Sequence, residues 1–123
     1  MTPSAIKLHR ASKELELAYT GNGHYRLPAE FLRVLSPSAE VRGHGGIGGE
    51  LPAGKIDVAI VDIKAVGNYG VQLVFDDGHD SGIYSWEYLH TLCQHRQQYW
   101  DDYLQQLQTA GLSRDPRVQV IRL

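Results

Sequence analysis

The stretch that decides the fold is FDDGHDSGIYSW, at residues 75–86. Asp77-Gly78 lies between two extended apolar patterns, and such a dipeptide is typical of a type I′ hairpin turn, which needs positive φ at both central residues. Ser85 then follows as a good N-cap in front of a long amphipathic pattern. This stretch predicts a strand, a tight turn, a second strand and the start of a helix.

The segments on either side predict further strands and two helices. Alternation of apolar and polar side chains indicates half-buried strands. The expected strands are residues 6–9, 14–19, 24–27, 56–66, 71–75 and 81–84. Pro28 suits the first turn of a short helix over residues 28–35. From Trp86 to Leu107 apolar residues recur at steps of three and four, which predicts one helix of about six turns.

These segments predict an α+β fold. An antiparallel sheet of about five or six strands should pack against the long C-terminal helix, with the short helix at residues 28–35 beside it. At this length the chain is expected to form a single domain over residues 1–112. The polar and weakly alternating residues 113–123 are expected to form a tail.

Composition excludes several classes of protein. The net charge of −2 leaves no basic excess to neutralise phosphates, so nucleic acid is not an expected partner. Cys93 is the only cysteine, which rules out an internal disulfide and suits the reducing cytoplasm. The N-terminal residues lack the apolar core of a signal peptide, and no apolar run is long enough to span a membrane. A cytoplasmic protein without membrane contact is therefore expected.

Three pieces of the chain resemble one known family. They are LRVLSPSAEV at residues 32–41, Gly67-Asn68-Tyr69, and residues 75–86 with the following Tyr88-Leu89. Together they resemble the gamma-butyrobetaine hydroxylase-like N-terminal domain family. The resemblance implies a stand-alone domain of unknown function. Some relatives are fused to P-loop ATPases that carry iron–sulfur clusters, which implies, by resemblance alone, an accessory role in metal-cofactor or cluster delivery.

The resemblance also bears on metal binding. In relatives attached to hydroxylases, three cysteines and a histidine hold a structural zinc. The three cysteine places are taken here by Ser36, Ser38 and Val41, and only His79 remains as a ligand type. Serine hydroxyls are poor neutral zinc ligands and valine is none, so no zinc and no other cofactor is expected. A metal- or small-ligand-binding domain that uses the His79 hairpin and its aspartates remains as an alternative.

Polar and aromatic residues gather in two of the family-like segments. One is the helix break at residues 33–44, and the other is the hairpin at residues 76–81. We expect the two segments to lie on adjoining surface and to contact a protein partner or ligand. The candidate binding residues are Arg33, Ser36, Ser38, Glu40, His44, Asp77, His79, Tyr84 and Trp86. The alternatives are a salt-bridged loop anchor for the charged residues and core packing for the aromatic ones.

Catalysis finds little support in the sequence. Neither Ser36 nor Ser38 has an obvious base beside it, and Cys93 lies on the apolar stripe, where a thiol is usually buried and inert. The glycine-rich residues 43–54 contain two phosphate-loop patterns, but a strand follows them where the nucleotide motifs need a helix. The expected function is therefore a small non-catalytic interaction or accessory domain with an unidentified protein partner. An enzyme is the less favoured class.

Overall fold

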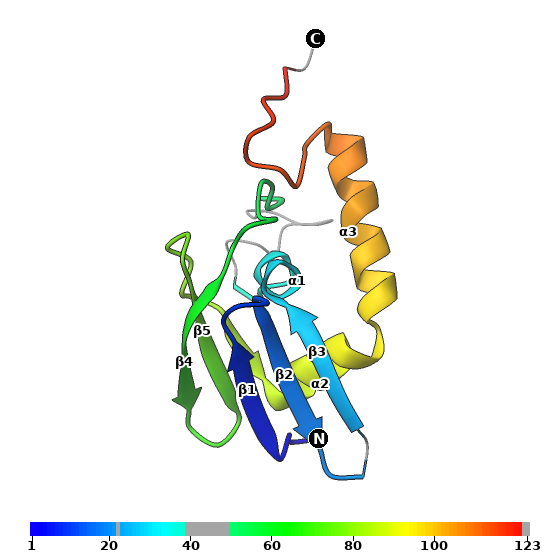
Figure 1. Ribbon diagram of the computed structural model, residues 1–123. Coiled ribbons are helices and arrows are strands. Elements are labelled where there is room, and N and C mark those ends of the chain that lie inside the picture. The colour runs from blue at the N-terminus through cyan, green and yellow to red at the C-terminus, as the bar shows by residue number, and fades with distance from the viewer. Residues whose placement is uncertain (22, 39–49, 122–123) are drawn as a thin grey trace.

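The computed structural model describes residues 1–21, 23–38 and 50–121, which fold into two three-stranded antiparallel sheets and three helices (Figure 1). The elements in chain order are β1 (Ala5–His9), β2 (Glu14–Tyr19), β3 (Gly23–Pro28), α1 (Ala29–Val34), β4 (Ile60–Val66), β5 (Gly70–Phe75), β6 (Ile83–Ser85), α2 (Trp86–Gln94) and α3 (Arg96–Ala110). The predicted α+β class is confirmed.

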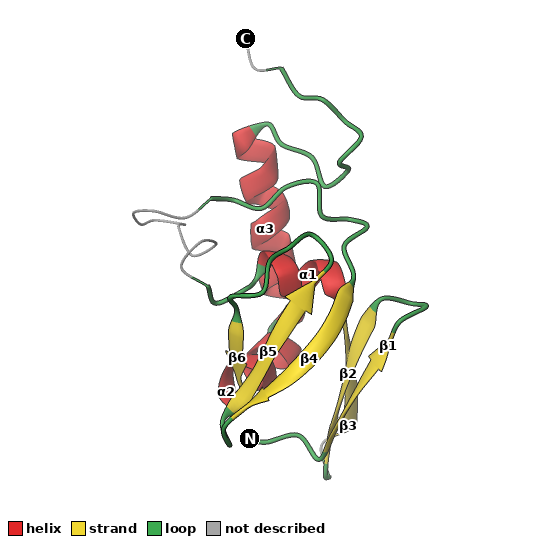
Figure 2. Cartoon of the chain, turned by 90° about the vertical axis from the view of Figure 1, so that its left-hand side faces the viewer, coloured by secondary structure: helices red, strands yellow, loops and turns green. Residues whose placement is uncertain are grey.

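The prediction of one sheet of five or six strands is wrong. β1, β2 and β3 form one sheet in that order, and β4, β5 and β6 form the other. Figure 2 shows the two sheets side by side, with α1 close to the ends of β3 and β4. Alternating residues predict a strand but not its neighbour, and β3 leads directly into α1 instead of pairing with a later strand. The strand expected over residues 56–66 begins only at Ile60, next to a register shift.

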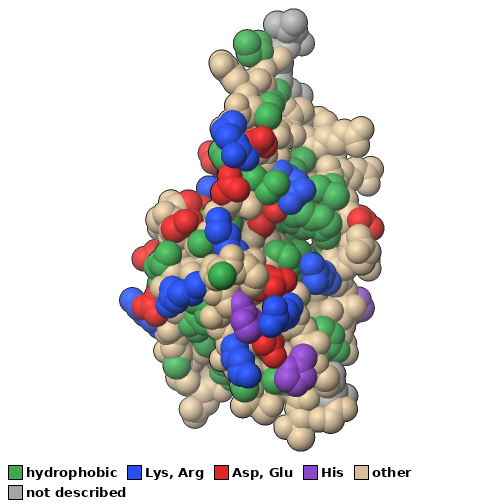
Figure 3. All heavy atoms as spheres, viewed as in Figure 1, with side chains coloured by type: hydrophobic (Ala, Val, Ile, Leu, Met, Phe, Trp, Pro, Cys, Tyr) green, Lys and Arg blue, Asp and Glu red, His purple; other side chains and the backbone are tan. Residues whose placement is uncertain are grey.

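The first sheet has one apolar and one polar face. Leu15, Leu17 and Tyr19 of β2 are buried, whereas Glu14 and Glu16 alternate with them on the other face. Charged and histidine side chains gather on the face seen in Figure 3. On the polar face of β2, Glu16 Oε1 lies 2.7 Å from His9 Nε2 and Glu16 Oε2 lies 2.8 Å from His24 Nδ1. The hydrogen bond to His24, then that to His9, lowers the pKa of Glu16 to about 2.

The long C-terminal helix is also wrong, because the helical pattern covers two helices. His95, with φ −117° and ψ 26°, separates α2 from α3. α2 buries Leu89 and Leu92 in the main core, while α3 turns away in Figure 1 and runs beside α1. Residues 94–98 are all exposed, and the buried residues of the two helices belong to different core clusters.

The core has two parts. The main part takes side chains from both sheets, α1 and α2, including Leu17, Phe31, Leu73 and Tyr84. A smaller cluster joins Val34 of α1 to Tyr103 and Leu107 of α3. Apolar burial of this extent is the main favourable contribution to folding. α1 therefore lies between the two parts and belongs to both.

The first residues of the segment that follows α3 are held against the rest of the domain. Arg114 donates hydrogen bonds of 2.8 and 2.6 Å to the two carboxylate oxygens of Glu30, which is buried in α1. The backbone N–H of Gly54 also donates to Ser113 O at 2.8 Å. The expected tail, residues 113–123, thus begins with a segment held against α1, and residues 118–121 are exposed. In the described ranges no helix combines the length and apolarity needed to cross a membrane.

The packing of α2 can be tested by truncating one buried leucine. Leu89 has no exposed surface, and Leu89→Ala should lower the free energy of unfolding by about 2–5 kcal/mol. Gln98 is exposed in α3, so Gln98→Ala should change it by less than about 0.5 kcal/mol. Urea unfolding followed by circular dichroism measures both variants. Equally small effects would contradict the placement of α2 in the core.

Candidate functional site

Residues 33–38, the described part of the first polar segment, lie against the second segment at residues 76–81. Arg33, in the last turn of α1, donates from Nε to Asp77 Oδ2 at 2.8 Å. Lys55 donates from Nζ to the same oxygen at 2.6 Å. Asp77 Oδ1 accepts the backbone N–H of His79 at 3.1 Å. One carboxylate thereby ties the end of α1, the segment before β4 and the β5–β6 connection together.

The type I′ turn expected at Asp77-Gly78 is not formed. Gly78 has a φ of 90°, but Asp77 does not have a positive φ, and β6 begins only at Ile83. The Gly78 N–H donates to Phe75 O at 3.2 Å, and residues 79–82 then continue as a loop. The β5–β6 connection is therefore a longer loop, and its Asp77 carboxylate contacts the end of α1.

Two tyrosines complete the end of α1. The last carbonyls of a helix have no partner within the helix and need one from elsewhere. Tyr84 of β6 donates its hydroxyl to Leu32 O, and Tyr88 of α2 donates to Leu35 O, both at 2.5 Å. Burial, the dominant influence, raises the pKa of Tyr84 far above its usual value, so this hydroxyl stays a donor.

Beneath these contacts lies a buried serine–histidine pair. A hydrogen bond of 2.8 Å joins Ser36 Oγ to His79 Nε2, and the two residues are only 2% and 6% exposed. Ser38 N–H donates to Ser36 Oγ at 3.3 Å, and the hydroxyls of Ser38 and Ser81 are 2.8 Å apart. A Cβ on Gly82 would lie 2.4 Å from Ser36 Oγ, so only glycine lets the loop approach this closely.

The pair resembles a nucleophile and its base, but its burial prevents that role. Sequence analysis found no base beside Ser36, and the structure supplies one from 43 positions further along the chain. A nucleophile needs open space for the reacting atom of a substrate. Ser36 Oγ instead faces His79, the Ser38 N–H and the backbone at Gly82. We therefore assign the pair a structural role.

The residues present do not fit the zinc site that the family resemblance implies. Two ligands with zinc bonds of 2.0–2.1 Å stand roughly 3.3 Å apart in a tetrahedral site. Ser36 and His79 instead bond each other directly at 2.8 Å. Val41 lies outside the described residues. Within residues 1–21, 23–38 and 50–121 no group of three or more histidine, cysteine or acidic side chains is arranged to hold a metal. Metal binding or delivery thus has no support among these residues.

The remaining candidates divide into surface and supporting residues. Tyr84 has no exposed surface, and Ser36, Ser38 and His79 are also buried, so they support the Arg33–Asp77 contact from beneath. Trp86 is half-buried and donates from Nε1 to Asn68 O at 2.8 Å, which anchors the β4–β5 turn instead of joining this group. Glu40 and His44 lie outside the described residues.

A small hollow opens beside Arg33. It has a volume of about 270 Å³ and is lined by Arg33, Glu50, the segment 51–53, Lys55 and His79. Within the described chain, Arg33 Nη1 is buried and has no hydrogen-bond partner. Sequence analysis did not select Lys55, although a lysine that ends a glycine-rich segment was visible there as an incomplete phosphate-loop pattern.

Asp77 remains ionised at this place. Its burial favours the neutral form, but the hydrogen bonds from Lys55, from the His79 N–H and from Arg33 outweigh burial and lower the pKa of Asp77 to about 2. Two cations share this single carboxylate, which leaves a surplus positive charge. Glu50 also lines the hollow, but it is exposed, where solvent and salt screen its charge.

The fold and this site define a small α+β domain in which polar side chains hold the end of α1 against the β5–β6 connection. A family model described as gamma-butyrobetaine hydroxylase-like, N-terminal matches residues 6–90, and the chain belongs to this family. The resemblance drawn from the three sequence pieces is confirmed. The family assignment does not itself supply an activity. A search of curated proteins finds no match.

Solved structures agree with this assignment. A solution NMR structure is 53% identical, with a TM-score of 0.82, and covers 99% of this chain and 96% of its own. A second solution NMR structure is 43% identical, with a TM-score of 0.77, and covers 99% and 91%. A crystal structure of a DUF971-family protein of unknown function from Acidithiobacillus ferrooxidans is 36% identical, with a TM-score of 0.61, and covers 74% and 91%.

The Asp77 contacts predict a specific dependence of stability on pH. The pKa of Asp77 is about 2 in the folded chain, against an ordinary value of 3.8, so its ionisation stabilises the fold above the ordinary value. That contribution is lost as pH falls through about 2. The difference in free energy of unfolding between the wild type and Asp77→Asn should therefore shrink between pH 4 and pH 2. Urea titrations at fixed pH values measure it, and a constant difference would contradict the ion-pair geometry.

Metal removal provides a second test. Because Ser36 and His79 bond each other directly, the melting temperature should be the same with and without excess chelator. Differential scanning calorimetry with elemental analysis of the same sample measures this. If the purified protein held one zinc per chain and lost stability on its removal, another ligand set would have to be present.

Proposed function

We propose that the chain is a non-catalytic recognition domain that docks an acidic segment of a protein partner on the Arg33–Lys55 surface. This surface consists of Arg33, the residues 50–55 that line the hollow, and the adjoining Asp77. The observation that carries the proposal is that Arg33 and Lys55 share the single carboxylate of Asp77 beside the hollow, so the three groups together carry one surplus positive charge. A carboxylate from a partner can balance such a charge.

The chemistry of the surface supports a carboxylate as the ligand. A guanidinium presents its donors in a flat fork that matches a carboxylate, and here only Nε of Arg33 is used by Asp77. Lys55 adds a second cation, because its Nζ donates to the same Asp77 oxygen. A carboxylate that enters the hollow would balance the surplus positive charge of Arg33 and Lys55.

Rigidity of the surrounding structure also supports recognition. Arg33 is fixed by α1, whose end is tied to Tyr84 and Tyr88, while Asp77 is held by the His79 backbone. A preorganised surface loses little conformational freedom when a partner binds. The single cysteine and the absence of a basic excess suit a protein partner in the cytoplasm better than nucleic acid.

The proposal is tested with a capped peptide of four glutamates as the probe. In a titration followed by ¹H–¹⁵N NMR, the signals of residues 33, 51, 53–55 and 77–79 should shift together. Arg33→Gln should weaken binding about tenfold or more, since a hydrogen bond to a charged group contributes about 1.5–3 kcal/mol. Lys55→Gln should weaken it as well. Arg33→Lys keeps the charge but loses the fork, and it should restore only part of the affinity.

The matched control is Lys64→Gln, which removes an exposed positive charge from β4. If binding depends only on net charge, this variant will weaken it as much as Lys55→Gln does, and the proposal fails. Shifts spread over the whole surface would have the same meaning. Each variant is first compared with the wild type by its NMR spectrum, so that loss of binding is not confused with loss of folding.

A further inference from the structure

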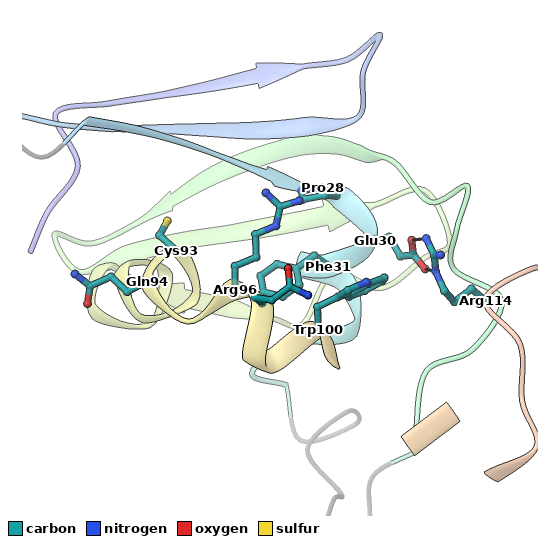
Figure 4. A pocket seen from close by; sticks show the side chains of 9 residues that line it. Pro28, Glu30, Phe31, Cys93, Gln94, Arg96, Trp100 and Arg114 are labelled. Carbon is teal, nitrogen blue, oxygen red and sulfur yellow. Dashed lines mark hydrogen bonds and ion pairs between the residues drawn. The ribbon is translucent and has the colours of Figure 1, made fainter. Parts of the chain in front are cut away.

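A second recess lies between α1 and the junction of α2 and α3. It has a volume of about 500 Å³, within the range of small-molecule sites, and shares no lining residue with the hollow beside Arg33. Its walls come from β3, α1, α2, α3 and the segment after α3. The lining residues are Pro28, Glu30, Phe31, Cys93, Gln94, Arg96, Gln97, Trp100 and Arg114. Figure 4 shows Trp100 between Phe31 and the Glu30–Arg114 pair, with Arg96 reaching toward Pro28.

The charges of this recess do not balance. Both carboxylate oxygens of Glu30 are taken by Arg114, so this pair is neutral as a unit. Arg96 donates from Nη1 to the backbone oxygen of Arg26 at 3.0 Å, and no ion pair involves it among the described residues. The Arg96 guanidinium therefore lies at the edge of an otherwise neutral recess and has further N–H donors available.

One wall of the recess is aromatic, while Glu30, Gln94, Arg96, Gln97 and Arg114 give the rest of the lining a polar character. The Trp100 and Phe31 rings lie 6.2 Å apart, and the Arg114 guanidinium lies 5.0 Å from the Trp100 ring centre. Trp100 is only partly buried, so part of its ring is open. Cys93 adds a thiol whose pKa is raised to about 11 by burial, so it stays neutral and acts as an apolar surface.

We propose that this recess binds a small organic monoanion with a flat apolar body. Its carboxylate would pair with the Arg96 guanidinium, and its body would lie against Trp100 and Phe31. The Glu30–Arg114 pair closes the far end and stays intact, because opening it would leave the Glu30 carboxylate buried without a partner.

The test uses indole-3-acetate as the probe and indole-3-acetamide as its neutral control. The chain has two tryptophans, and Trp86 donates its indole N–H to Asn68 O, outside the recess. In a ¹H–¹⁵N NMR titration the Trp100 indole and the amides of residues 94–97 should shift, while the Trp86 indole should not. The amide should bind about tenfold more weakly than the carboxylate, because it cannot form a charge-assisted pair.

Two variants separate the recess from the Arg33–Lys55 surface. Arg96→Gln should weaken indole-3-acetate about tenfold and leave binding of the tetraglutamate peptide unchanged. Lys64→Gln, which removes a charge on β4, should change neither. The proposal is overturned if the Trp100 signal does not move at millimolar probe, if acid and amide bind equally, or if Arg96→Gln has no effect. Shifts confined to residues 33, 51 and 53–55 would place the carboxylate at the other surface and also overturn it.

Discussion

The structure depends on how the carbonyl groups at the end of α1 are satisfied. α1 has only six residues, too few to be stable alone in water, and five of them are buried. Its unpaired carbonyls cannot turn to solvent there. The hydroxyls of Tyr84 and Tyr88 reach them from β6 and α2, at Leu32 O and Leu35 O. Because these donors come from the second sheet and the helix after it, the same two hydrogen bonds fix the second half of the chain to the first.

The residues around this contact form layers of different polarity. The innermost is the Ser36–His79 hydrogen bond, which joins two buried side chains. Outside it lie the paired charges of Arg33, Asp77 and Lys55, whose side chains are 12%, 18% and 22% exposed. A neutral pair can be buried at low cost, whereas charges must be paired or near solvent. This order explains why the polar motif residues divide between support and surface.

Local sequence patterns predicted most of the helices and strands, but only the structure showed which elements pair or pack together. Period-2 alternation identified β2 and β5, and Pro28 with the apolar spacing after it identified α1, because each depends on neighbouring residues. The division into two sheets depends on which strands pair, and alternation carries no such information. The break at His95 was hidden because both helices continue one apolar spacing while packing against different clusters.

The candidate site was predicted in the same uneven way. The two segments could be chosen from their composition, and Arg33 and Asp77 do meet, yet the Ser36–His79 bond spans 43 positions and leaves no local pattern. The recess lined by Trp100 was not predicted from the sequence, for the same reason. Its Glu30–Arg114 pair spans 84 positions, and Trp100 was indistinguishable from the core residues of the helical stripe. Spacing along one helix cannot show that a side chain faces a recess.

The Glu30–Arg114 pair has a consequence for the order of events during synthesis. Glu30 leaves the ribosome 84 residues before the guanidinium that neutralises it. The first sheet needs only residues up to Pro28 and can form early, since domains fold from the N-terminal side as the chain grows. α1 cannot be buried without leaving a carboxylate unpaired until Arg114 has emerged. A ribosome-bound chain that ends between the first sheet and Arg114 would therefore carry an ordered meander and an undocked α1, with the two-part core closing as a late step.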